Sequence, residues 1–372
     1  MQQIESMKKL KVIISGGGTG GHIFPALAIA KAIEKKVENV DFLFVGAEDR
    51  MEMEKVPAAG YKIVGLWISG LQRNFSRRNL LFPLKLISSL LKAKKIIKQF
   101  KPDLAIGTGG YASGPLLFSA ANKGVPSIIQ EQNSYPGITN KILAKYVQKV
   151  CVAYDNMERF FGNKKLIITG NPIRENILNF DVKIEAGIKL FDIDASIPTV
   201  LVVGGSLGAR TINDAIAENI ADFKTSKVNL IWQTGISFQY QAKEITNQLG
   251  IAGIQAHTFI EEMDLAYAAA DVIISRAGAI AISELCCVGK PVILVPSPNV
   301  SENHQYKNAQ SLVNKNAALL VKDMDASRKL VPSILELLGN SSKQKKLSDN
   351  IKKLAVEDAA DRIAEIALGL IK

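Results

Sequence analysis

The stretch V-I-I-S-G-G-G-T-G-G-H-I-F-P-A-L-A-I-A, residues 12–30, decides the fold. A short apolar run leads into five glycines within six positions, interrupted only by Thr19, and a helical pattern begins near Pro25. Proline suits the first turn of a helix. Glycine lets the backbone come close to a ligand, and the free N–H groups of the next helix attract an anion. The stretch therefore predicts a strand, a phosphate-binding loop and a helix.

The glycines alone leave two other interpretations open. A plain tight turn between a strand and a helix needs the same residues. Gly16, Gly18 and Gly21 also match the dinucleotide fingerprint G-x-G-x-x-G, which on its own is a weak signal. His22, an ionisable base directly after the loop, favours a functional loop over a plain turn.

Length and composition narrow the class of protein. A chain of 372 residues predicts two or three domains, and 47% apolar with 22% charged residues is typical of a soluble globular protein. No apolar run approaches the ~20 residues of a membrane helix, and the N-terminus lacks a signal-peptide core. The three cysteines, Cys151, Cys286 and Cys287, have no metal-ligand spacing, so we expect reduced thiols in a cytosolic protein.

The positive charge is concentrated in one tract. The net charge is +11, and residues 55–102 contain eleven lysines or arginines and no acidic residue, so the remainder is close to neutral. One basic patch indicates a docking face, whereas uniform basicity would have indicated nucleic acid. No RNA-binding signature accompanies the tract.

Two series of strand–helix units follow one another along the chain. In the first, strands are expected at residues 11–15, 40–45, 63–68, 103–107, 127–130, 149–153 and 166–169. Its fourth strand runs into a second glycine-rich loop, G-T-G-G-Y-A-S-G, at 107–114. Residues 179–198 read as an irregular connection. The second series opens with T-V-L-V-V-G-G-S-L-G-A-R at 199–210 and has further strands at 230–233, 255–259, 272–275, 291–296 and 318–321. Such alternation predicts an α/β fold with two doubly wound parallel sheets.

Polar residues collect at the ends of these strands, where ligands bind in parallel sheets. Arg174 after Asn-Pro suits a phosphate, although a surface arginine is the alternative. Ser206 serves equally well as a helix cap, and Asn133 as a turn residue. Glu284 lies in the first turns of a helix, where its two oxygens suit the hydroxyls of a ribose or, alternatively, the helix dipole.

Six motifs resemble one family in order and spacing from about residue 9 to 309. They are G-G-G-T-G-G-H, E-Q-N, G-N-P-I-R, G-G-S-L-G-A-R-x-I-N, S-R-A-G-A-x-x-x-S-E and N-H-Q-Y-x-N-A. Together they resemble the MurG family, which transfers N-acetylglucosamine (GlcNAc) from UDP-GlcNAc to the N-acetylmuramic acid (MurNAc) of lipid I, giving lipid II in peptidoglycan synthesis. The resemblance implies the GT-B fold, two doubly wound Rossmann-like domains facing across a cleft, and an inverting, metal-independent hexosyltransferase without a cofactor.

The resemblance also implies the division of labour in the chain. Residues 1–174 would form a domain for the acceptor and the membrane, with a helix at about 355–372 packing back on it, and residues 175–354 would bind UDP-GlcNAc. The partners would be UDP-GlcNAc, the undecaprenyl-diphosphate-linked MurNAc-pentapeptide, an anionic membrane surface and other cell-wall synthesis proteins. The location would be peripheral, on the cytoplasmic face of the bacterial inner membrane.

Site residues follow from the matched motifs. His22 is expected to be the base, or alternatively to fix the loop. Thr19, Gly20 and Gly21 match the loop at the donor's sugar and phosphate end. Arg174 and Ser206 match positions near the nucleotide and its diphosphate, and the backbone of Ile260 matches the contact to uracil. The full set of expected donor contacts is Thr19, Gly20, Gly21, Asn133, Arg174, Ser206, Ile260, Ala279, Ile280, Ala281, Ile282, Ser283, Glu284 and Gln305. The acceptor and its diphosphate are assigned to Gly109, Gly110, Tyr111 and Ser113.

A polyprenyl-linked acceptor requires the protein to reach a bilayer. We expect part of the apolar set in the basic tract to form the core face of a helix at 83–100. The remainder is expected to dock on the membrane through apolar insertion and attraction to anionic lipid. The expected docking residues are Leu71, Arg73, Phe75, Arg77, Arg78, Leu81 and Phe82.

Two residues depart from the family pattern. Gln130 replaces a frequent histidine before E-Q-N, which weakens a mechanism with a second histidine. His304 replaces a frequent glutamine, which leaves the donor-sugar contact to Gln305. Two D-x-D strings, at 192–194 and 323–325, raise the alternative of a metal-bound diphosphate, but neither follows a strand beside a glycine loop.

Other functions remain as alternatives. Another GT-B transferase with a lipid acceptor has the same motifs, and a non-catalytic sugar-nucleotide sensor would need no base such as His22. An NAD-dependent dehydrogenase is disfavoured, because Glu48 and Asp49 lie beyond the ~20-residue spacing of a ribose partner.

Overall fold

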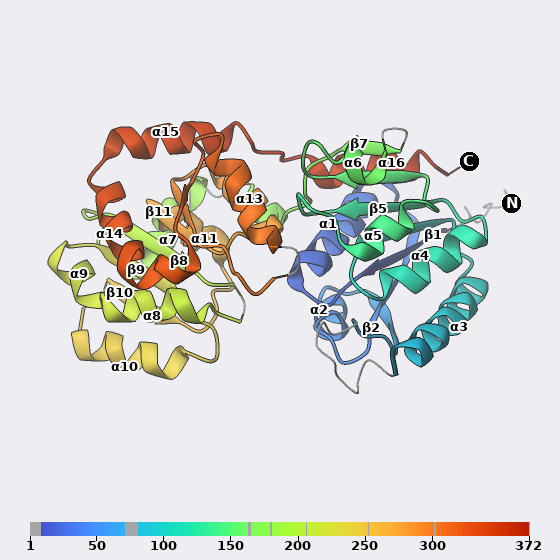
Figure 1. Cartoon of the computed structure of the whole chain (residues 1–372), viewed down its shortest axis with the longest axis horizontal. Helices are drawn as coiled ribbons and strands as arrows, with labels where there is room; N and C mark the ends of the chain where they lie inside the picture. Colours follow the sequence, from blue (N-terminus) through green and yellow to red (C-terminus); the bar gives the residue numbers. More distant parts are fainter. Residues whose placement is uncertain are drawn as a thin grey trace, which may run out of the picture. The chain divides into compact units, whose positions relative to one another are not determined.

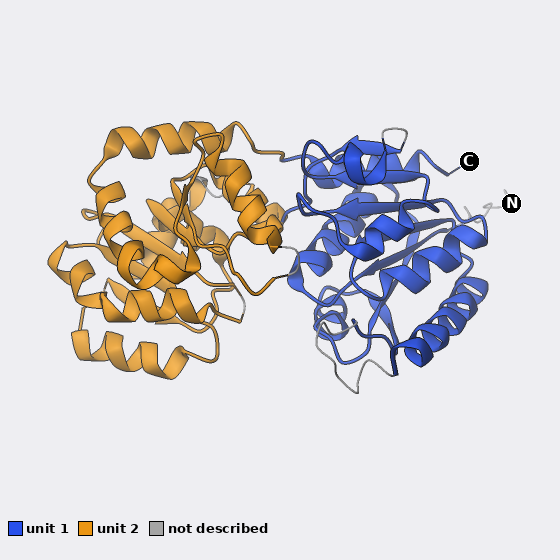
Figure 2. Ribbon diagram, in the orientation of Figure 1, with its two compact units in different colours: residues 1–173, 357–372 blue, residues 174–356 orange. Residues whose placement is uncertain are grey.

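The chain forms two compact units, which Figure 2 distinguishes by colour. The computed structural model describes residues 9–70, 81–162, 165–178, 181–205, 207–251, 253–300 and 303–371. Unit 1 comprises residues 1–173 and 357–372, and unit 2 comprises residues 174–356. Arg174 is therefore the first residue of unit 2, one position before the start expected for the second domain.

Unit 1 is built on a seven-stranded parallel sheet (Figure 1). Its strands are β1 (Leu10–Gly16), β2 (Val40–Ala47), β3 (Lys62–Leu66), β4 (Leu104–Gly109), β5 (Ser127–Glu131), β6 (Lys149–Val152) and β7 (Leu166–Ile168). Their order in the sheet is β3-β2-β1-β4-β5-β6-β7. The order reverses between β1 and β4, so the loops after these two strands flank the point where such sheets bind ligands.

Both faces of this sheet are covered by helices. One face packs on α1 (Gly20–Lys36), α2 (Glu52–Ala58) and α16 (Ala359–Leu368), and the other on α3 (Phe82–Phe100), α4 (Ser113–Asn122) and α5 (Ile138–Leu143). The short helix α6 is Glu158–Phe161. Strand β1 shows how the side chains alternate between the two faces. Val12 and Ile14 pack on the face that α1, α2 and α16 cover, Ile13 packs on the opposite face, and all three are fully buried. A continuous apolar strand is what burial on both faces requires.

Unit 2 repeats this architecture with six parallel strands in the order β10-β9-β8-β11-β12-β13. The strands are β8 (Thr199–Val203), β9 (Asn229–Gln233), β10 (Ile254–His257), β11 (Val272–Ser275), β12 (Val292–Leu294) and β13 (Leu319–Leu320). One face packs on α8 (Arg210–Glu218), α9 (Ile220–Thr225), α10 (Gln239–Leu249) and α14 (Ala326–Leu338). The other packs on α7 (Ile184–Leu190), α11 (Met263–Ala269), α12 (Ala279–Val288) and α13 (His304–Val313), and α15 (Ser341–Lys352) adds a residue to each core.

The predicted class, two doubly wound parallel sheets, is confirmed, but two local predictions are wrong. Helix α1 begins at Gly20 rather than near Pro25, because the carbonyl of Thr19 accepts the N–H groups of His22 and Ile23. Residues 179–198 are not simply irregular, since they contain α7. This helix forms because Ile188 packs against the core of unit 2, as does Phe191, the residue that follows the helix.

Two general expectations concern the cysteines and the membrane. All three cysteines are free and buried, and burial raises the pKa of Cys151 and of Cys286 to about 12, which keeps these two thiols protonated. In the ranges that the structure covers, no helix has both the length and the apolar character of a membrane span.

Helix α16 completes the core of unit 1 from the far end of the chain. Ile363, Ala364 and Ala367 pack in the same core as Val12 and Ile14, although more than 300 residues separate them in sequence. On the surface, Lys36 of α1 pairs with Glu365 of α16 at 2.8 Å. The apolar contact should contribute far more than the exposed ion pair.

We expect Ile363→Ala to lower the free energy of unfolding of unit 1 by about 2–5 kcal/mol, because it leaves a cavity in a closed core. Urea unfolding followed by fluorescence measures this, since Trp67 reports on unit 1 and Trp232 on unit 2. The control Glu365→Gln removes only the surface pair, which solvent screens, and should leave the free energy of unfolding nearly unchanged. Equal losses in the two variants would contradict the assignment of α16 to the core.

Candidate functional site

A buried carboxylate anchors the glycine loop after β1. Glu52, the first residue of α2, is fully buried, and its Oε2 accepts the N–H of Gly18 at 2.8 Å while Oε1 accepts that of Ala47 at 2.9 Å. A Cβ at Gly17 would overlap Oε1 of Glu52. The carboxylate therefore fixes the loop through charge-assisted hydrogen bonds, and only glycine fits beside it.

The loops after β1 and β4 pack directly on each other. Gly110 has a φ of +89°, and a Cβ there would overlap the carbonyl oxygen of Gly17. Ser113 is fully buried, and its hydroxyl lies 2.9 Å from the carbonyl oxygen of Ser15 and 2.8 Å from that of Gly109. The hydroxyl of Ser113 thus holds the two loops together instead of facing a ligand.

His22 lies in the first turn of α1, at the point where these loops meet. Its Nδ1 lies 2.9 Å from the carbonyl oxygen of Thr108 and 3.1 Å from Oε1 of Gln132. Because both neighbours are acceptors, Nδ1 carries the proton in the neutral ring and Nε2 keeps a lone pair. Nε2 makes no hydrogen bond to any residue in the covered ranges. The geometry is that of a base with one oriented, available nitrogen.

Other expected residues of unit 1 surround this loop. Thr19 is exposed and extended at the N-cap of α1, where the N–H groups of Gly20 and Gly21 begin the helix. Asn133 donates its backbone N–H (3.1 Å) and its Nδ2 (3.3 Å) to Oε1 of the buried Glu131. These bonds hold Asn133 against the end of β5, and both its turn interpretation and its contact to a sugar stay predictions.

In unit 2, Arg174 and Glu284 form a bidentate ion pair. Nε of Arg174 donates to Oε1 at 2.8 Å and Nη2 to Oε2 at 2.9 Å, and Glu284 is only 4% exposed. The pairing itself was not anticipated from the sequence, which assigned the two side chains to separate groups of the donor. Arg174 uses one lone pair on each carboxylate oxygen and the hydroxyl of Tyr267 uses another, so one lone pair of Glu284 and further N–H donors of Arg174 are left for a ligand.

The surroundings stabilise this pair electrostatically. Burial lowers the pKa of Arg174, but the hydrogen bonds and the charge of Glu284 raise it by more, so the net shift is upward. Burial and then the charge of Glu284 raise the pKa of Tyr267, which keeps this phenol neutral beside the carboxylate. Glu284 thus has a cation and a neutral hydroxyl as its partners.

The start of α12 supplies backbone N–H groups. Gly278 is the extended N-cap, and Ala279, Ile280 and Ala281 form the first turn. The hydroxyl of Ser283 donates to the carbonyl of Ala279 at 3.0 Å, so it serves the helix. The side chain of Ile282 is buried in the core, and its N–H donates to the carbonyl of Gly278 at 2.9 Å, so Ile282 supports the start of the helix.

Gln305, at the start of α13, is partly engaged within the protein. Its Oε1 accepts the N–H of Ser297 at 2.9 Å, so Nε2 is the group that can donate to a sugar hydroxyl. Ser206, expected at the diphosphate, lies outside the described residues, as do Leu71, Arg73, Phe75, Arg77 and Arg78 of the docking segment.

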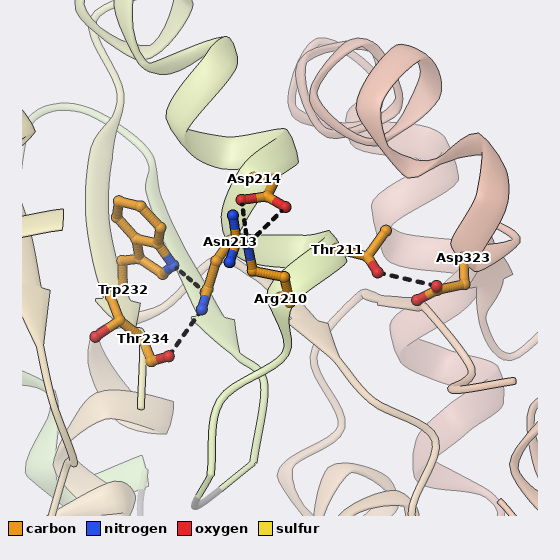
Figure 3. Close-up of polar contacts among 7 residues, drawn as sticks. All are labelled: Arg210, Thr211, Asn213, Asp214, Trp232, Thr234 and Asp323. Carbon is orange, nitrogen blue, oxygen red and sulfur yellow. Dashed lines mark hydrogen bonds and ion pairs between the residues drawn. The ribbon is translucent and has the colours of Figure 1, made fainter. Parts of the chain in front are cut away.

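The loop after β8 packs on the loop after β9. Gly208 has a φ of +79°, and a Cβ there would overlap the carbonyl oxygen of Thr234. Figure 3 shows the hydrogen bonds of Asn213 that hold this contact. Its Nδ2 donates to the carbonyl of Thr234 at 2.8 Å, and its Oδ1 accepts from Nε1 of Trp232 at 3.0 Å. The chain needs glycine at 208 because two main chains meet there.

Gln233 ties the same loop to Ile260. Its Nε2 donates to the carbonyl of Gly205 at 3.0 Å, and its Oε1 accepts the N–H of Ile260 at 2.9 Å. The N–H of Ile260 therefore has a partner within the protein. The contact expected between the backbone of Ile260 and uracil must accordingly be made by the carbonyl of Ile260.

The D-x-D string at 323–325 has a structural partner. Asp323 forms an ion pair with Arg276 and accepts the hydroxyl of Thr211 at 2.9 Å, the latter contact being visible in Figure 3. In the other string, Asp194 accepts the N–H and the hydroxyl of Ser196. Within the described ranges, no group of three or more histidine, cysteine, aspartate or glutamate residues could hold a metal ion.

Several residues that shape the site were missed by sequence reasoning. Glu52, Glu131, Gln132 and Gln233 are all buried polar residues that bind loop atoms. The motif E-Q-N marked the segment with Glu131 and Gln132 but not their partners. No local pattern identifies Glu52 as buried, because a glutamate at the start of a helix is ordinary on a surface.

Comparisons with known proteins agree with this architecture. The model of the glycosyltransferase family 28 N-terminal domain matches residues 12–152, and that of the family 28 C-terminal domain matches residues 199–363. A crystal structure of MurG from Acinetobacter baumannii superposes with a TM-score of 0.76 at 24% identity, covering 97% of this chain and 100% of that one. This likeness confirms the GT-B fold.

Two curated relatives are much closer in sequence. Both are named UDP-N-acetylglucosamine–N-acetylmuramyl-(pentapeptide) pyrophosphoryl-undecaprenol N-acetylglucosamine transferase. The protein from Cytophaga hutchinsonii is 53% identical over 98% of both chains, and that from Parabacteroides distasonis is 52% identical over 98% of this chain and 99% of its own. The chain therefore belongs to the family of these N-acetylglucosamine transferases, the MurG family.

Proposed function

We propose that this protein transfers GlcNAc from UDP-GlcNAc to the 4-hydroxyl of the MurNAc of lipid I, forming lipid II. The names of the close relatives support the overall reaction. The observation that carries the chemistry is Nε2 of His22, a lone pair with no partner among the residues that the structure describes, where the β1 and β4 loops meet. A sugar-nucleotide sensor would need no such base.

In the proposed reaction, Nε2 of His22 accepts the proton of the acceptor hydroxyl. The hydroxyl oxygen forms a bond to the anomeric carbon of GlcNAc as the bond from that carbon to the β-phosphate oxygen breaks. The bonding electron pair leaves with UDP, and attack opposite the leaving group inverts the anomeric configuration. His22 gains the proton that the hydroxyl loses, so the step is balanced.

We assign the nucleotide to unit 2. Glu284, already oriented by Arg174, would accept the ribose hydroxyls, and the carbonyl of Ile260 would accept from the uracil ring. The first turn of α12, Ala279–Ala281, which Ile282 and Ser283 support, and Ser206 would bind the uridine and its diphosphate. Nε2 of Gln305 would donate to GlcNAc. Helix N-termini and the further N–H groups of Arg174 would stabilise the leaving diphosphate without a metal ion.

Unit 1 is assigned the base and the acceptor. Thr19, Gly20, Gly21 and Asn133 would contact the donor's sugar and phosphate end. The loop at Gly109, Gly110 and Tyr111 would receive the acceptor and its diphosphate, since Tyr111 is half exposed. We therefore assign Ser113 a supporting role in this loop.

We further propose that unit 1 docks peripherally on the anionic cytoplasmic face of the inner membrane. Leu84, Ile87 and Leu91 of α3 are 59%, 56% and 62% exposed at helical spacing, next to Leu81. The exposed Lys94, Lys95 and Lys98 follow on the same helix. This combination is typical of a helix that lies in a membrane interface. The docking surface thus extends from the expected segment, which includes Phe82, onto α3.

The first prediction concerns the base. His22→Ala should lower kcat by ~10²–10⁴-fold, because general base catalysis contributes that much, and UDP affinity should stay near wild type. Steady-state kinetics and calorimetric titration with UDP measure the two effects. If UDP binding falls as far as turnover does, His22 only scaffolds the loop.

The second prediction concerns the ribose. Glu284→Ala should raise KM for UDP-GlcNAc by the equivalent of about 1–3 kcal/mol, the range for a charged hydrogen-bond partner. A 2′-deoxyribose donor should bind more weakly to the wild type but lose little further on the variant. Asp264→Asn is the matched control, since it neutralises another buried carboxylate of unit 2, paired with Lys183. Additive losses for Glu284→Ala and the deoxy donor would rule out a ribose contact.

The third prediction concerns the membrane. Changing Leu84, Ile87 and Leu91 together to Ser should release the protein from anionic vesicles, because each inserted side chain contributes about 1.5–3 kcal/mol. Changing Arg73, Arg77 and Arg78 to Glu should do the same by charge. Activity on a short-chain, water-soluble acceptor should survive in both variants.

Vesicle sedimentation measures the release. The control variant, Ile236→Ser with Tyr240→Ser, removes exposed apolar side chains from unit 2 and should sediment like wild type. Vesicle binding that persists in the α3 triple variant and at raised salt would place the docking surface elsewhere.

A further inference from the structure

Three buried amide side chains lead from the end of β7 to His22. They are Asn171, Gln130 at β5, and Gln132 just after β5, and each is at most 1% exposed. Gln130 occupies the position where the family resemblance predicts histidine. The hydrogen bonds along this series allow only one orientation for each amide.

The direction is set at Asn171. Its Nδ2 donates to the main-chain carbonyl of Gln132 at 3.1 Å, so its Oδ1 accepts Nε2 of Gln130 at 2.8 Å. Gln130 then presents Oε1, which accepts Nε2 of Gln132. Gln132 Nε2 also donates to the carbonyl of Thr108 at 2.5 Å. Because both of these partners are oxygens that only accept, the group of Gln132 that faces them must be its NH₂. Its side-chain oxygen Oε1 therefore faces Nδ1 of His22 and accepts the proton there.

The groups that hold Nδ1 are therefore both neutral acceptors. The buried carboxylates on neighbouring elements are directed elsewhere. Glu52 of α2 accepts backbone N–H groups of Gly18 and Ala47, and Glu131 of β5 accepts Asn133, Gly137 and Asn140. Helix α4 has no ionisable residue between Ser113 and Asn122, and the first on α1 after His22 is Lys31.

We propose that Gln132 is a positioning residue of the transferase, and that Gln130 and Asn171 hold its amide in the orientation that keeps the proton of His22 on Nδ1. This inference rests on the proposed role of His22 as the base. A carboxylate at position 132 would also orient the ring, but it would stabilise the protonated imidazolium. A neutral amide orients the ring without adding the negative charge that would favour the imidazolium, which suits a residue that acts as a base.

The test is Gln132→Glu, read by ¹⁵N NMR of the imidazole and by the pH dependence of kcat/KM. The chain has three histidines, and the signals of His22 are those lost in His22→Ala. In the wild type, Nδ1 should carry the proton of the neutral ring. In Gln132→Glu the pKa of His22 should rise by about one to three units, and the acid limb of kcat/KM should move up equally.

The matched control is Gln148→Glu. Gln148 is exposed and its Oε1 accepts the N–H of Ser127, at the opposite end of β5. The same charge is added to the same unit, yet neither the NMR titration nor the acid limb should move. If Gln132→Glu does not fold, Gln132→Met serves instead. It should lower kcat about tenfold, the equivalent of one hydrogen bond, with KM for UDP-GlcNAc unchanged.

The outcomes separate the two claims. A wild-type ring protonated on Nε2, an unmoved pKa in folded Gln132→Glu, or an unaltered kcat in Gln132→Met overturns the positioning role. A raised pKa with an unmoved acid limb upholds the orientation of His22 by Gln132 and overturns the role of His22 as the base. A raised pKa that the acid limb follows supports both.

Discussion

The contact between the main chains of Gly17 and Gly110 is the constraint on which the rest of unit 1 depends. A Cβ at Gly110 would overlap the carbonyl oxygen of Gly17, so the loops after β1 and β4 approach only without a side chain. This approach puts the carbonyl of Thr108 within 2.9 Å of Nδ1 of His22, and Oγ1 of Thr108 within 2.7 Å of the carbonyl of His22. His22 is thus oriented by two strands that neighbour each other at the reversal of strand order.

Unit 2 uses the same kind of contact at a different place. There the β8 loop meets the β9 loop, through Gly208 and Thr234, rather than the loop after β11. Because β8 lies between β9 and β11, the start of α12 is on the other side of the β8 loop from this contact. The β8 loop is therefore fixed on one side by the β9 loop. Its other side neighbours the N-terminus of α12, and a helix N-terminus can bind an anion.

Much of the fold could be predicted from the sequence, because apolar strands covered on both faces read as continuous apolar runs. The motifs also located the loops that matter, since glycine and proline act locally. What could not be predicted was the pairing of buried polar groups. Arg174 and Glu284 are 110 residues apart, and Glu52 and Gly18 are 34 apart. Helix α7 was missed for a related reason, because it depends on packing with distant residues of unit 2 rather than on its own pattern.

The ion pair of Arg174 and Glu284 shows why these distant pairings bear on function. A buried carboxylate is costly unless it is paired and hydrogen-bonded, and Arg174 meets both conditions with two bonds. The orientation of Glu284 is therefore settled before any nucleotide arrives. A ribose hydroxyl would meet an acceptor that need not reorganise, which is the condition under which a hydrogen bond contributes most to recognition. Glu52 plays the corresponding part for the glycine loop of unit 1, with backbone N–H groups in place of the guanidinium.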